Sequence, residues 1–395
     1  MGGVIHISIR NNLFYPINLV IHYYLRKIVS IIIASKYKFN DSLIYSVMML
    51  FGEFFAGLAI YIYQFISIKR NQEHKNISKY FGTSLFKYFK YRNTMKKSHN
   101  NFIIVLLIFF AAYFNLSQFI IASFYIPKFN IISQTASYRF GGIIIIVGAL
   151  ICHFNLRIKM LKHHFYSLII LAICSLIVII IEFIYRRSGI SIESFFLCYL
   201  LVIFNLVFVA FTDVIEKYLL EYDYMNPFLT LFIESIFGFI LLGIFSIQEN
   251  LFKDIKRLYN ESSSGDFALL LFLLLLYFVF SAGTNTYKII TNGLYSPMVK
   301  TLVIYILNPT LFIYYFAVGS DFMSGDDRNW IYFIISLTTA IIISFFGCVF
   351  NEFLVLSCCG LDKDTHYAIS KRAIRTKSEV ITELTDYTYT FEEDN

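Results

Sequence analysis

Charged side chains are scarce in this sequence. Only 15% of its 395 residues are Asp, Glu, Lys or Arg, whereas 58% are hydrophobic, and the mean hydropathy is +0.66. A soluble domain carries about 25% charged residues, so the composition excludes a protein whose main solvent is water. Proline is scarce too, with five residues, as expected of helices that are seldom interrupted. The six cysteines are scattered without the spacing of a disulfide framework or a zinc site.

The apolar residues are gathered in long runs of about 20, the length that a helix needs to cross a hydrocarbon core. Each run must be helical, because hydrocarbon offers no partner to a backbone amide. The first run contains His22, Arg26 and Lys27, so it is either a span or an amphipathic helix at the membrane surface. The sequence therefore predicts an all-α integral membrane protein of about ten transmembrane helices, at residues 14–35, 44–67, 102–122, 131–152, 165–185, 194–216, 227–246, 267–288, 297–317 and 330–357.

The basic residues predict the orientation of the chain. With both termini in the cytoplasm, about two thirds of the 33 Lys and Arg residues fall on the cytoplasmic side, as the positive-inside rule requires. The net charge of +7 is thereby explained without a nucleic-acid partner. The basic, aromatic loop 68–101 is expected either to rest on anionic membrane lipid as an amphipathic helix or to be solvated. The polar tail 361–395 is expected to be disordered.

Two of the predicted spans are alike. Leu, Phe, Glu and Gly recur at the same spacing in Leu50–Gly57 and in Leu231–Gly238, and each segment lies in the second span of a five-span half. The two halves, residues 1–190 and 191–360, would face opposite ways because each has an odd number of spans. Such inverted repeats are typical of secondary transporters, which bind substrate near the midplane. The alternative is a chance match between two Phe- and Leu-rich segments.

Charges within spans are costly and mark candidate functional sites. Arg139, followed by two glycines, lies near the middle of the fourth span. It either binds a phosphate or carboxylate of a substrate or forms a structural ion pair with Glu53 or Glu234. Three roles are open for these two glutamates: an ion pair with Arg139, the binding of a proton, or hydrogen bonds between helices. Glu182 is expected to form a surface pair with Arg186, four residues on.

Polar residues of the later spans complete the candidate substrate site. Asn285 and Lys288 end the eighth span in a stretch of small and polar residues, and Asn308-Pro309 predicts a kink in the ninth. His163-His164 is expected to face solvent in a basic loop. Because no nucleotide-binding loop, HExxH motif or Ser-His-Asp arrangement is present, the sequence predicts no enzyme, no cofactor and no metal site.

Several short segments carry a resemblance to a known group of proteins: Met48–Phe54, Tyr138–Gly142, Thr212–Leu219, Phe350–Phe353 and Cys359–Leu361. The chain resembles the drug/metabolite transporter superfamily (EamA-like proteins), and within it the nucleotide-sugar-transporter-like solute carriers of family 35, F branch. The resemblance extends over residues 17–373, and the charged first span and the long basic loop depart from the pattern. It implies a five-plus-five inverted repeat, alternating access, an internal eukaryotic membrane, and substrates such as nucleotide sugars or other organic anions.

These observations lead to one expected function and one alternative. We expect a secondary transporter of a small organic anion, with Arg139 attracting the anion and Glu53 and Glu234 balancing charge or carrying a proton. Asn285, Lys288 and Asn308 are expected to line the substrate path. A homodimer is compatible with these expectations. The alternative is a polytopic membrane scaffold or receptor that transports nothing.

Overall fold

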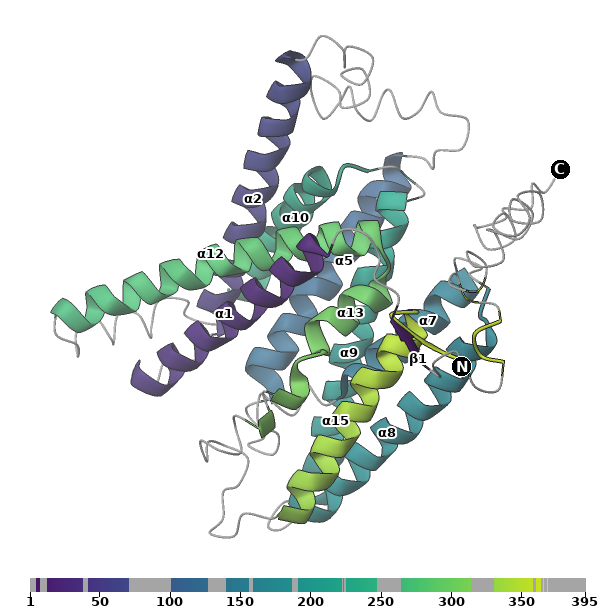
Figure 1. Ribbon diagram of the computed structural model, residues 1–395. Coiled ribbons are helices and arrows are strands. Elements are labelled where there is room, and N and C mark those ends of the chain that lie inside the picture. Colours follow the sequence, from purple (N-terminus) through teal and green to yellow (C-terminus); the bar gives the residue numbers. More distant parts are fainter. Residues whose placement is uncertain are drawn as a thin grey trace, which may run out of the picture. The chain divides into compact units, whose positions relative to one another are not determined.

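The computed structural model describes residues 5–7, 13–37, 42–70, 101–126, 140–155, 159–186, 191–221, 223, 225–246, 264–310, 312–313, 330–357, 360–363, 365 and 368. Arg139, residues 71–100 of the basic loop and nearly all of the tail 361–395 lie outside these ranges. Within them the chain forms ten α-helices (Figure 1): α1 (Phe14–Tyr37), α2 (Ser42–Arg70), α5 (Asn101–Ile120), α7 (Gly141–Asn155), α8 (Lys162–Arg186), α9 (Ile192–Glu221), α10 (Pro227–Ser246), α12 (Ser264–Leu294), α13 (Pro297–Tyr305) and α15 (Trp330–Phe350).

Each predicted span corresponds to one of these helices. Eight of them, all but the shorter α7 and α13, are long and apolar enough to cross a membrane. The chain is therefore a multi-pass helical membrane protein. The first helix qualifies as a span in spite of its charges. A five-residue π-helical segment, Ile121–Tyr125, extends α5.

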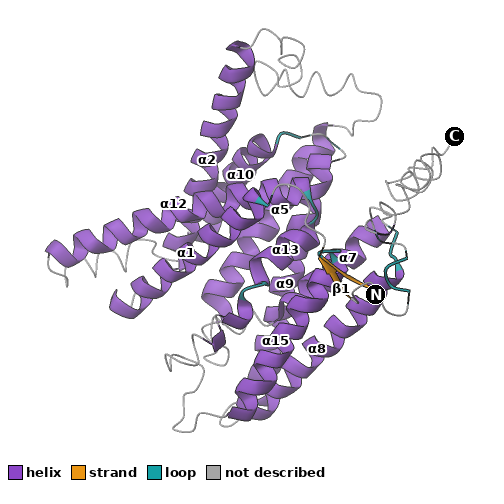
Figure 2. Ribbon diagram, viewed as in Figure 1, coloured by secondary structure: helices purple, strands orange, loops and turns teal. Residues whose placement is uncertain are grey.

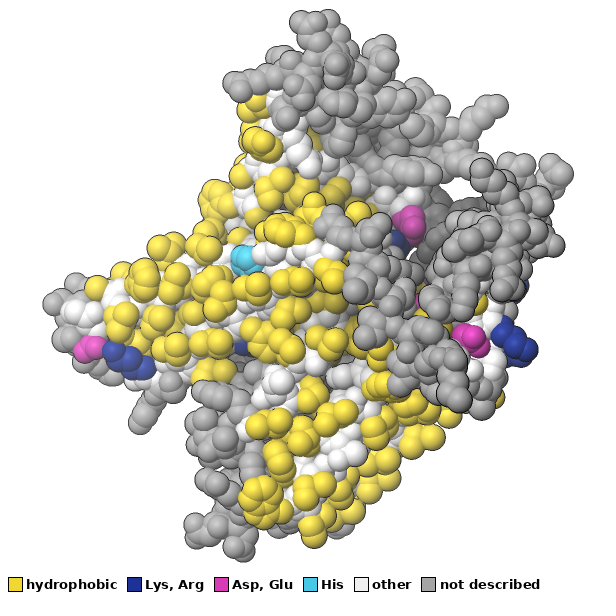
Figure 3. Space-filling view, viewed as in Figure 1, with side chains coloured by type: hydrophobic (Ala, Val, Ile, Leu, Met, Phe, Trp, Pro, Cys, Tyr) yellow, Lys and Arg dark blue, Asp and Glu magenta, His cyan; other side chains and the backbone are white. Residues whose placement is uncertain are grey.

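The surface of the helices fits a lipid environment. On α8, exposed apolar side chains recur every three or four residues and form one continuous stripe, whereas Leu171, Cys174 and Val178 on the same helix are buried. In the view of Figure 3, hydrophobic side chains cover most of the surface formed by the described residues. Because water would disfavour so much exposed apolar surface, these stripes are best explained as lipid-facing. The stripe of α8 consists of Phe165, Tyr166, Ile169, Ile173, Leu176, Ile180 and Ile184.

Two helix starts are capped by the side chain of the residue that precedes the helix. The Asn226 side-chain oxygen accepts hydrogen bonds from the backbone amides of Phe228 (2.9 Å) and Leu229 (3.3 Å), and α10 begins at Pro227. At α13, the Ser296 hydroxyl accepts from the Val299 amide at 3.0 Å. Both arrangements place an N-cap residue before a proline in the first turn.

The described contacts divide the chain into two compact units. Unit 1 combines residues 1–13, 126–210 and 301–395, and unit 2 combines residues 14–125 and 211–300. Each unit therefore draws on both of the halves predicted from the sequence. The helices α9 and α13 each begin in one unit and end in the other.

Unit 2 is built on close helix crossings. α1 lies along α12, and α2 packs against both α10 and α12 (Figure 1). A Cβ atom added at Gly52 would lie 2.9 Å from the Ala282 backbone nitrogen, and one at Gly57 would lie 2.8 Å from the Phe228 carbonyl oxygen. Small residues at such crossings allow the backbones of membrane helices to approach.

Unit 1 is built around α8 and α15, which run antiparallel. The His163 end of α8 lies beside Glu352, and its Glu182 end lies beside Tyr332. Glu182 is fully buried and accepts hydrogen bonds from the hydroxyl groups of Tyr199 (3.0 Å) and Tyr332. The expected surface position of Glu182 was therefore wrong. Glu182 is not part of the lipid-facing stripe of α8 and lies on the opposite, buried side of the helix.

A small sheet in unit 1 is the one departure from helix among the described elements (Figure 2). Strand β1 (Ile5–Ile7) pairs antiparallel with β2 (Leu354–Leu356), with His6 opposite Val355. The sequence analysis expected no strand, since three residues are too few to show an alternating pattern. The pairing fixes the segment that follows α15.

Candidate functional site: a charged cluster in unit 2

The helix α9 continues beyond its predicted end and brings charge into the bundle. The sequence analysis ended this span at residue 216, but the helix extends to Glu221. Asp213 and Glu216 lie three residues apart and therefore share one face of the helix. Both are buried. The boundary was misplaced because consecutive polar residues resemble the end of a span.

Two lysines meet these carboxylates. Lys288 of α12 donates a hydrogen bond to Glu216 Oε1 at 3.0 Å, and its Nζ lies 3.7 Å from Asp213 Oδ1. Lys300 of α13 pairs with Asp213 Oδ2. Lys288 was predicted from the sequence to end the eighth span, and α12 continues past it to Leu294. Lys300, near the start of the predicted ninth span, is only 2% exposed.

An asparagine completes the arrangement. Asn292 lies one helical turn after Lys288, and its Nδ2 donates to Glu216 Oε2 at 3.1 Å and to the Asp213 carbonyl oxygen at 2.8 Å. We call Asp213, Glu216, Lys288, Asn292 and Lys300 the charged cluster. Its members come from three helices, so that the cluster joins α9, α12 and α13 within unit 2.

Lys217 binds the end of α12 rather than the cluster. Its Nζ donates to the carbonyl oxygens of Gly293 and Tyr295, both at 3.1 Å, and lies 3.2 Å from Glu221 Oε2. A cation is favourable at a helix C-terminus, where carbonyl groups lack helical partners. Lys217 thus holds the turn between α12 and α13 in place, and with it the position of Lys300.

The two glutamates of the repeat lie close to this cluster. Glu53 and Glu234 are buried, and the charge of Lys288 acts on both. Asn115 donates to Glu53 Oε1 at 3.2 Å. Neither carboxylate oxygen of Glu234 has a hydrogen-bond partner among the described residues. Such a buried group is favoured in the neutral form, which makes Glu234 the member of this set best suited to carry a proton.

The acidic groups outnumber the basic ones in this part of unit 2. Four carboxyl groups, those of Glu53, Asp213, Glu216 and Glu234, interact with the ammonium groups of Lys288 and Lys300. Arg26 of α1 adds a positive charge that acts on Glu53. The arrangement can exchange partners: an anion can replace a carboxylate at a lysine, and a proton can neutralise the carboxylate that is released.

Four of the six site residues predicted from the sequence belong to unit 2. Glu53, Glu234 and Lys288 interact electrostatically, and Asn285 lies on α12 one turn before Lys288, buried, with its Nδ2 unpartnered among the described residues. Asn308 is buried in unit 1. The predicted kink beside it is confirmed, because α13 ends at Tyr305 and a turn covers Ile306 and Leu307. Arg139 lies outside the described residues.

The sequence analysis missed Asp213, Glu216, Asn292 and Lys300 as site residues. One signal was available: the next helix start, Asn226-Pro227, lies ten residues beyond Glu216. That gap leaves room for another helical turn, which would have moved Asp213 and Glu216 away from the end of the span. Comparison of the chain with known proteins adds no assignment, because no protein-family model and no curated protein sequence matches it.

Proposed function

We propose that this protein is a secondary transporter that moves a small organic anion across a membrane by alternating access. The observation that carries the proposal is the charged cluster, in which the buried Lys300 and the largely covered Lys288 (16% exposed) are held by buried carboxylates within a helical membrane bundle. Buried charges of this kind are expensive in a membrane and mark substrate or ion pathways. No catalytic constellation is part of the proposal, which is for a carrier and not an enzyme.

The helix contacts support an inverted repeat of two five-helix halves. Numbered by span, the second and seventh helices (α2, α10) pack together, as do the fifth and tenth (α8, α15). The second also packs against the eighth (α12), and its counterpart, the seventh, packs against the third (α5). A repeat that relates each helix to the one five spans later makes the contact of the second and eighth helices equivalent to that of the seventh and third. It also explains why each unit draws on both halves.

The crossing of α2 and α10 follows the same symmetry. Gly57 lies against Phe228 and Phe232 of α10, and Gly238, which matches Gly57 in the repeat, lies against Leu50 of α2. The two helices therefore run antiparallel, and each places its repeat glycine against the earlier part of the other. This arrangement supports the proposed repeat, in which the two segments correspond.

Anion binding would proceed by exchange of partners at Lys288. The ammonium group is shared between Glu216 and Asp213, so a substrate phosphate or carboxylate can take the place of one of them. Protonation of Glu234 offsets the added negative charge, and Glu53 contributes to the same balance. Arg139 is proposed to attract the anion first, with Asn285 and Asn308 lining the path.

The resemblance to the drug/metabolite transporters gives the proposal its substrate class. A nucleotide sugar or related metabolite fits a site that presents ammonium groups to phosphate. On the same ground we propose an internal membrane. The distribution of Lys and Arg residues supports the proposal that both termini lie in the cytoplasm.

A membrane scaffold or receptor remains the second candidate. The observation that favours it is the pairing of charges within the cluster, since Glu216 and Lys288 have partners for their charged groups there. A bundle with mutually satisfied charges is stable without moving anything.

Uptake by sealed proteoliposomes separates the two candidates. The purified chain is reconstituted and tested with radiolabelled nucleotide sugars, sugar phosphates and dicarboxylates, each with and without a proton gradient. The transporter predicts saturable, time-dependent uptake of one class over protein-free vesicles. No uptake of any of these anions by folded protein would favour the scaffold. Unchanged transport by Arg139→Ala would refute the role given to Arg139.

A further inference from the structure

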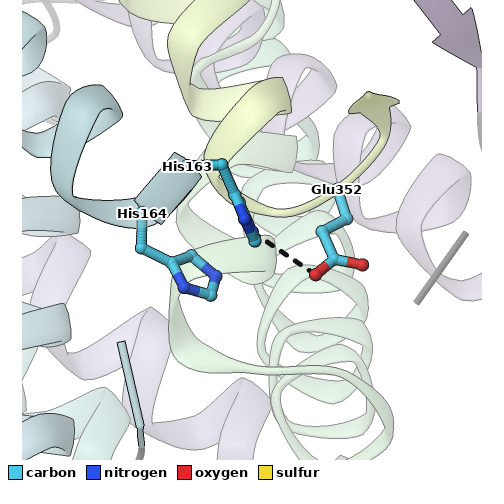
Figure 4. A group of neighbouring side chains, drawn as sticks. All are labelled: His163, His164 and Glu352. Atoms are coloured by element: carbon cyan, nitrogen blue, oxygen red, sulfur yellow. Dashed lines mark ion pairs between the residues drawn. The ribbon is translucent and has the colours of Figure 1, made fainter. Parts of the chain in front are cut away.

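Three potential metal ligands, none of them a member of the charged cluster, come together at one end of unit 1 (Figure 4). His163 and His164 lie in the first turn of α8, and Glu352 follows the end of α15. One ligand atom from each residue lies within 4.8 Å of the other two. The expectation that both histidines face solvent was wrong for His163, which is 2% exposed.

The distance between His163 and Glu352 matches the distance between two ligand atoms bound to the same metal ion. His163 Nε2 lies 3.3 Å from Glu352 Oε1, yet neither ring nitrogen of His163 has a hydrogen-bond partner among the described residues. Two ligand atoms at about 2.0–2.1 Å from a zinc ion, at the tetrahedral angle, are about 3.3 Å apart. The pair is thus placed as two ligands of one ion would be.

The backbone at Glu352 is shaped to present its carboxylate. Its φ is 57°, in the left-handed region that favours glycine. The Phe353 amide donates to the Cys348 carbonyl at 2.9 Å, which closes the helix end in the manner that usually has glycine at this position. A glutamate here accepts backbone strain, and its side chain reaches His163. Strand β2, paired with β1, follows directly.

His164 supplies the third ligand. Its ring centroid lies 4.0 Å from that of His163 and 4.8 Å from that of Phe350, and the Leu161 amide donates to its Nδ1 at 3.0 Å. The ring is therefore held beside the other two ligands. Metal binding exchanges this one hydrogen bond for a metal–nitrogen bond.

We propose that His163, His164 and Glu352 bind a divalent transition-metal ion, Zn²⁺ by ligand type. Two imidazoles and one carboxylate form a three-ligand set that zinc accepts, with water in the fourth position. The ion would join the start of α8 to the end of α15, and so would fasten the two antiparallel helices of unit 1. The proposal is independent of the transport function, because none of the three residues belongs to the substrate site.

Zinc content and thermal stability of the full chain test this site. Purified protein in detergent is stripped with a chelator and titrated with ZnCl₂, and bound zinc is measured by mass spectrometry. We expect one zinc per chain and a rise in the unfolding temperature. His163→Gln should weaken binding at least tenfold, whereas His153→Gln, a change in α7 outside the set, should not.

The variant Glu352→Gly distinguishes a loss of zinc binding from a loss of folding. Glycine suits the left-handed backbone at this position, so the variant should be at least as stable as the parent without zinc. It should nevertheless lose most of the stabilisation by zinc, while the exposed carboxylate of Glu193 can be replaced (Glu193→Gln) without effect. A parent that binds no zinc, or binds it as weakly as Glu352→Gly and His163→Gln, overturns the proposal.

Discussion

At the scale of single residues, the ion pair of Asp213 with Lys300 is the most deeply buried of the charged cluster. Removing one member of a buried pair leaves an uncompensated charge, which costs about 3–5 kcal/mol. Lys300→Met should therefore lower the free energy of unfolding by about that much in denaturant or thermal assays. The double variant Asp213→Asn/Lys300→Met should recover more than half of the loss, because no buried charge is then left unpaired.

An exposed pair offers the control for this experiment. Lys36 and Asp266 lie 3.5 Å apart, with both side chains about half exposed. Lys36→Met should change stability by less than about 1 kcal/mol, as is usual for surface ion pairs. Equal losses in Lys300→Met and Lys36→Met would contradict the buried character of the cluster.

Glu234 gives a second prediction at this scale. Because its carboxylate has no hydrogen-bond partner among the described residues, a neutral amide of the same shape removes no such bond. Glu234→Gln should leave the unfolding temperature unchanged or raise it. In proteoliposomes it should abolish the dependence of uptake on an imposed pH gradient, since the proposed proton carrier is gone. Retention of full pH dependence in this variant assigns the proton to another group.

At the scale of elements, the crossing of α2 and α10 depends on its glycines unequally. A Cβ at Gly57 meets backbone atoms at 2.8 and 2.9 Å, whereas one at Gly238 meets the flexible Leu50 side chain. Gly57→Ala must push the helices apart and should cost about 1–3 kcal/mol. Gly238→Ala should cost less. Chemical unfolding in detergent measures both.

The matched control lies on α10, the helix that also carries Gly238. A Cβ at Gly243 meets nothing within 4 Å among the described atoms. Gly243→Ala should therefore stabilise α10 slightly, by up to about 1 kcal/mol, through the loss of glycine's backbone freedom. If Gly57→Ala behaves like Gly243→Ala, the close approach of α2 and α10 is incorrect.

The hydrogen bonds from Tyr199 and Tyr332 to Glu182 are testable in the same way. Tyr332→Phe removes one of the two hydroxyl donors to a fully buried carboxyl. A buried polar group that loses a partner costs about 1–3 kcal/mol, so the unfolding temperature should fall. Tyr166→Phe, on the lipid-facing stripe of α8, should have no such effect. A fall of the same size in both variants would mean that the hydroxyl of Tyr332 does not hold Glu182.

Much of the helical architecture was predictable, because long apolar runs leave little choice of structure. Glu53 and Glu234 were also found from the sequence, since an acidic residue stands out in such a run. Asp213 and Glu216 were missed because polar residues near a predicted boundary look like its end. Lys300, near the predicted start of the ninth span, was missed for the same reason. His163 and Glu352 are 189 positions apart in the numbering, and no local pattern predicts that they meet.

At the scale of the whole molecule, the proposed inverted repeat pairs helices from the two halves of the sequence. The pairs α2/α10 and α8/α15 each combine a helix of the first predicted half with one of the second, and both run antiparallel. Antiparallel counterparts are expected of a repeat with an odd number of spans. Under this proposal, one set of contacts would serve two states that the two-fold axis of the repeat interchanges, as alternating access requires.

Anion transport through the charged cluster is tested by uptake of the anion identified in the proteoliposome screen, compared among the parent chain, Lys288→Ala and Lys36→Ala. All three are reconstituted at equal amounts and shown to be folded. We expect saturable uptake by the parent and by Lys36→Ala, and a loss of at least tenfold in Lys288→Ala. Undiminished uptake by Lys288→Ala would show that the anion does not bind at this lysine.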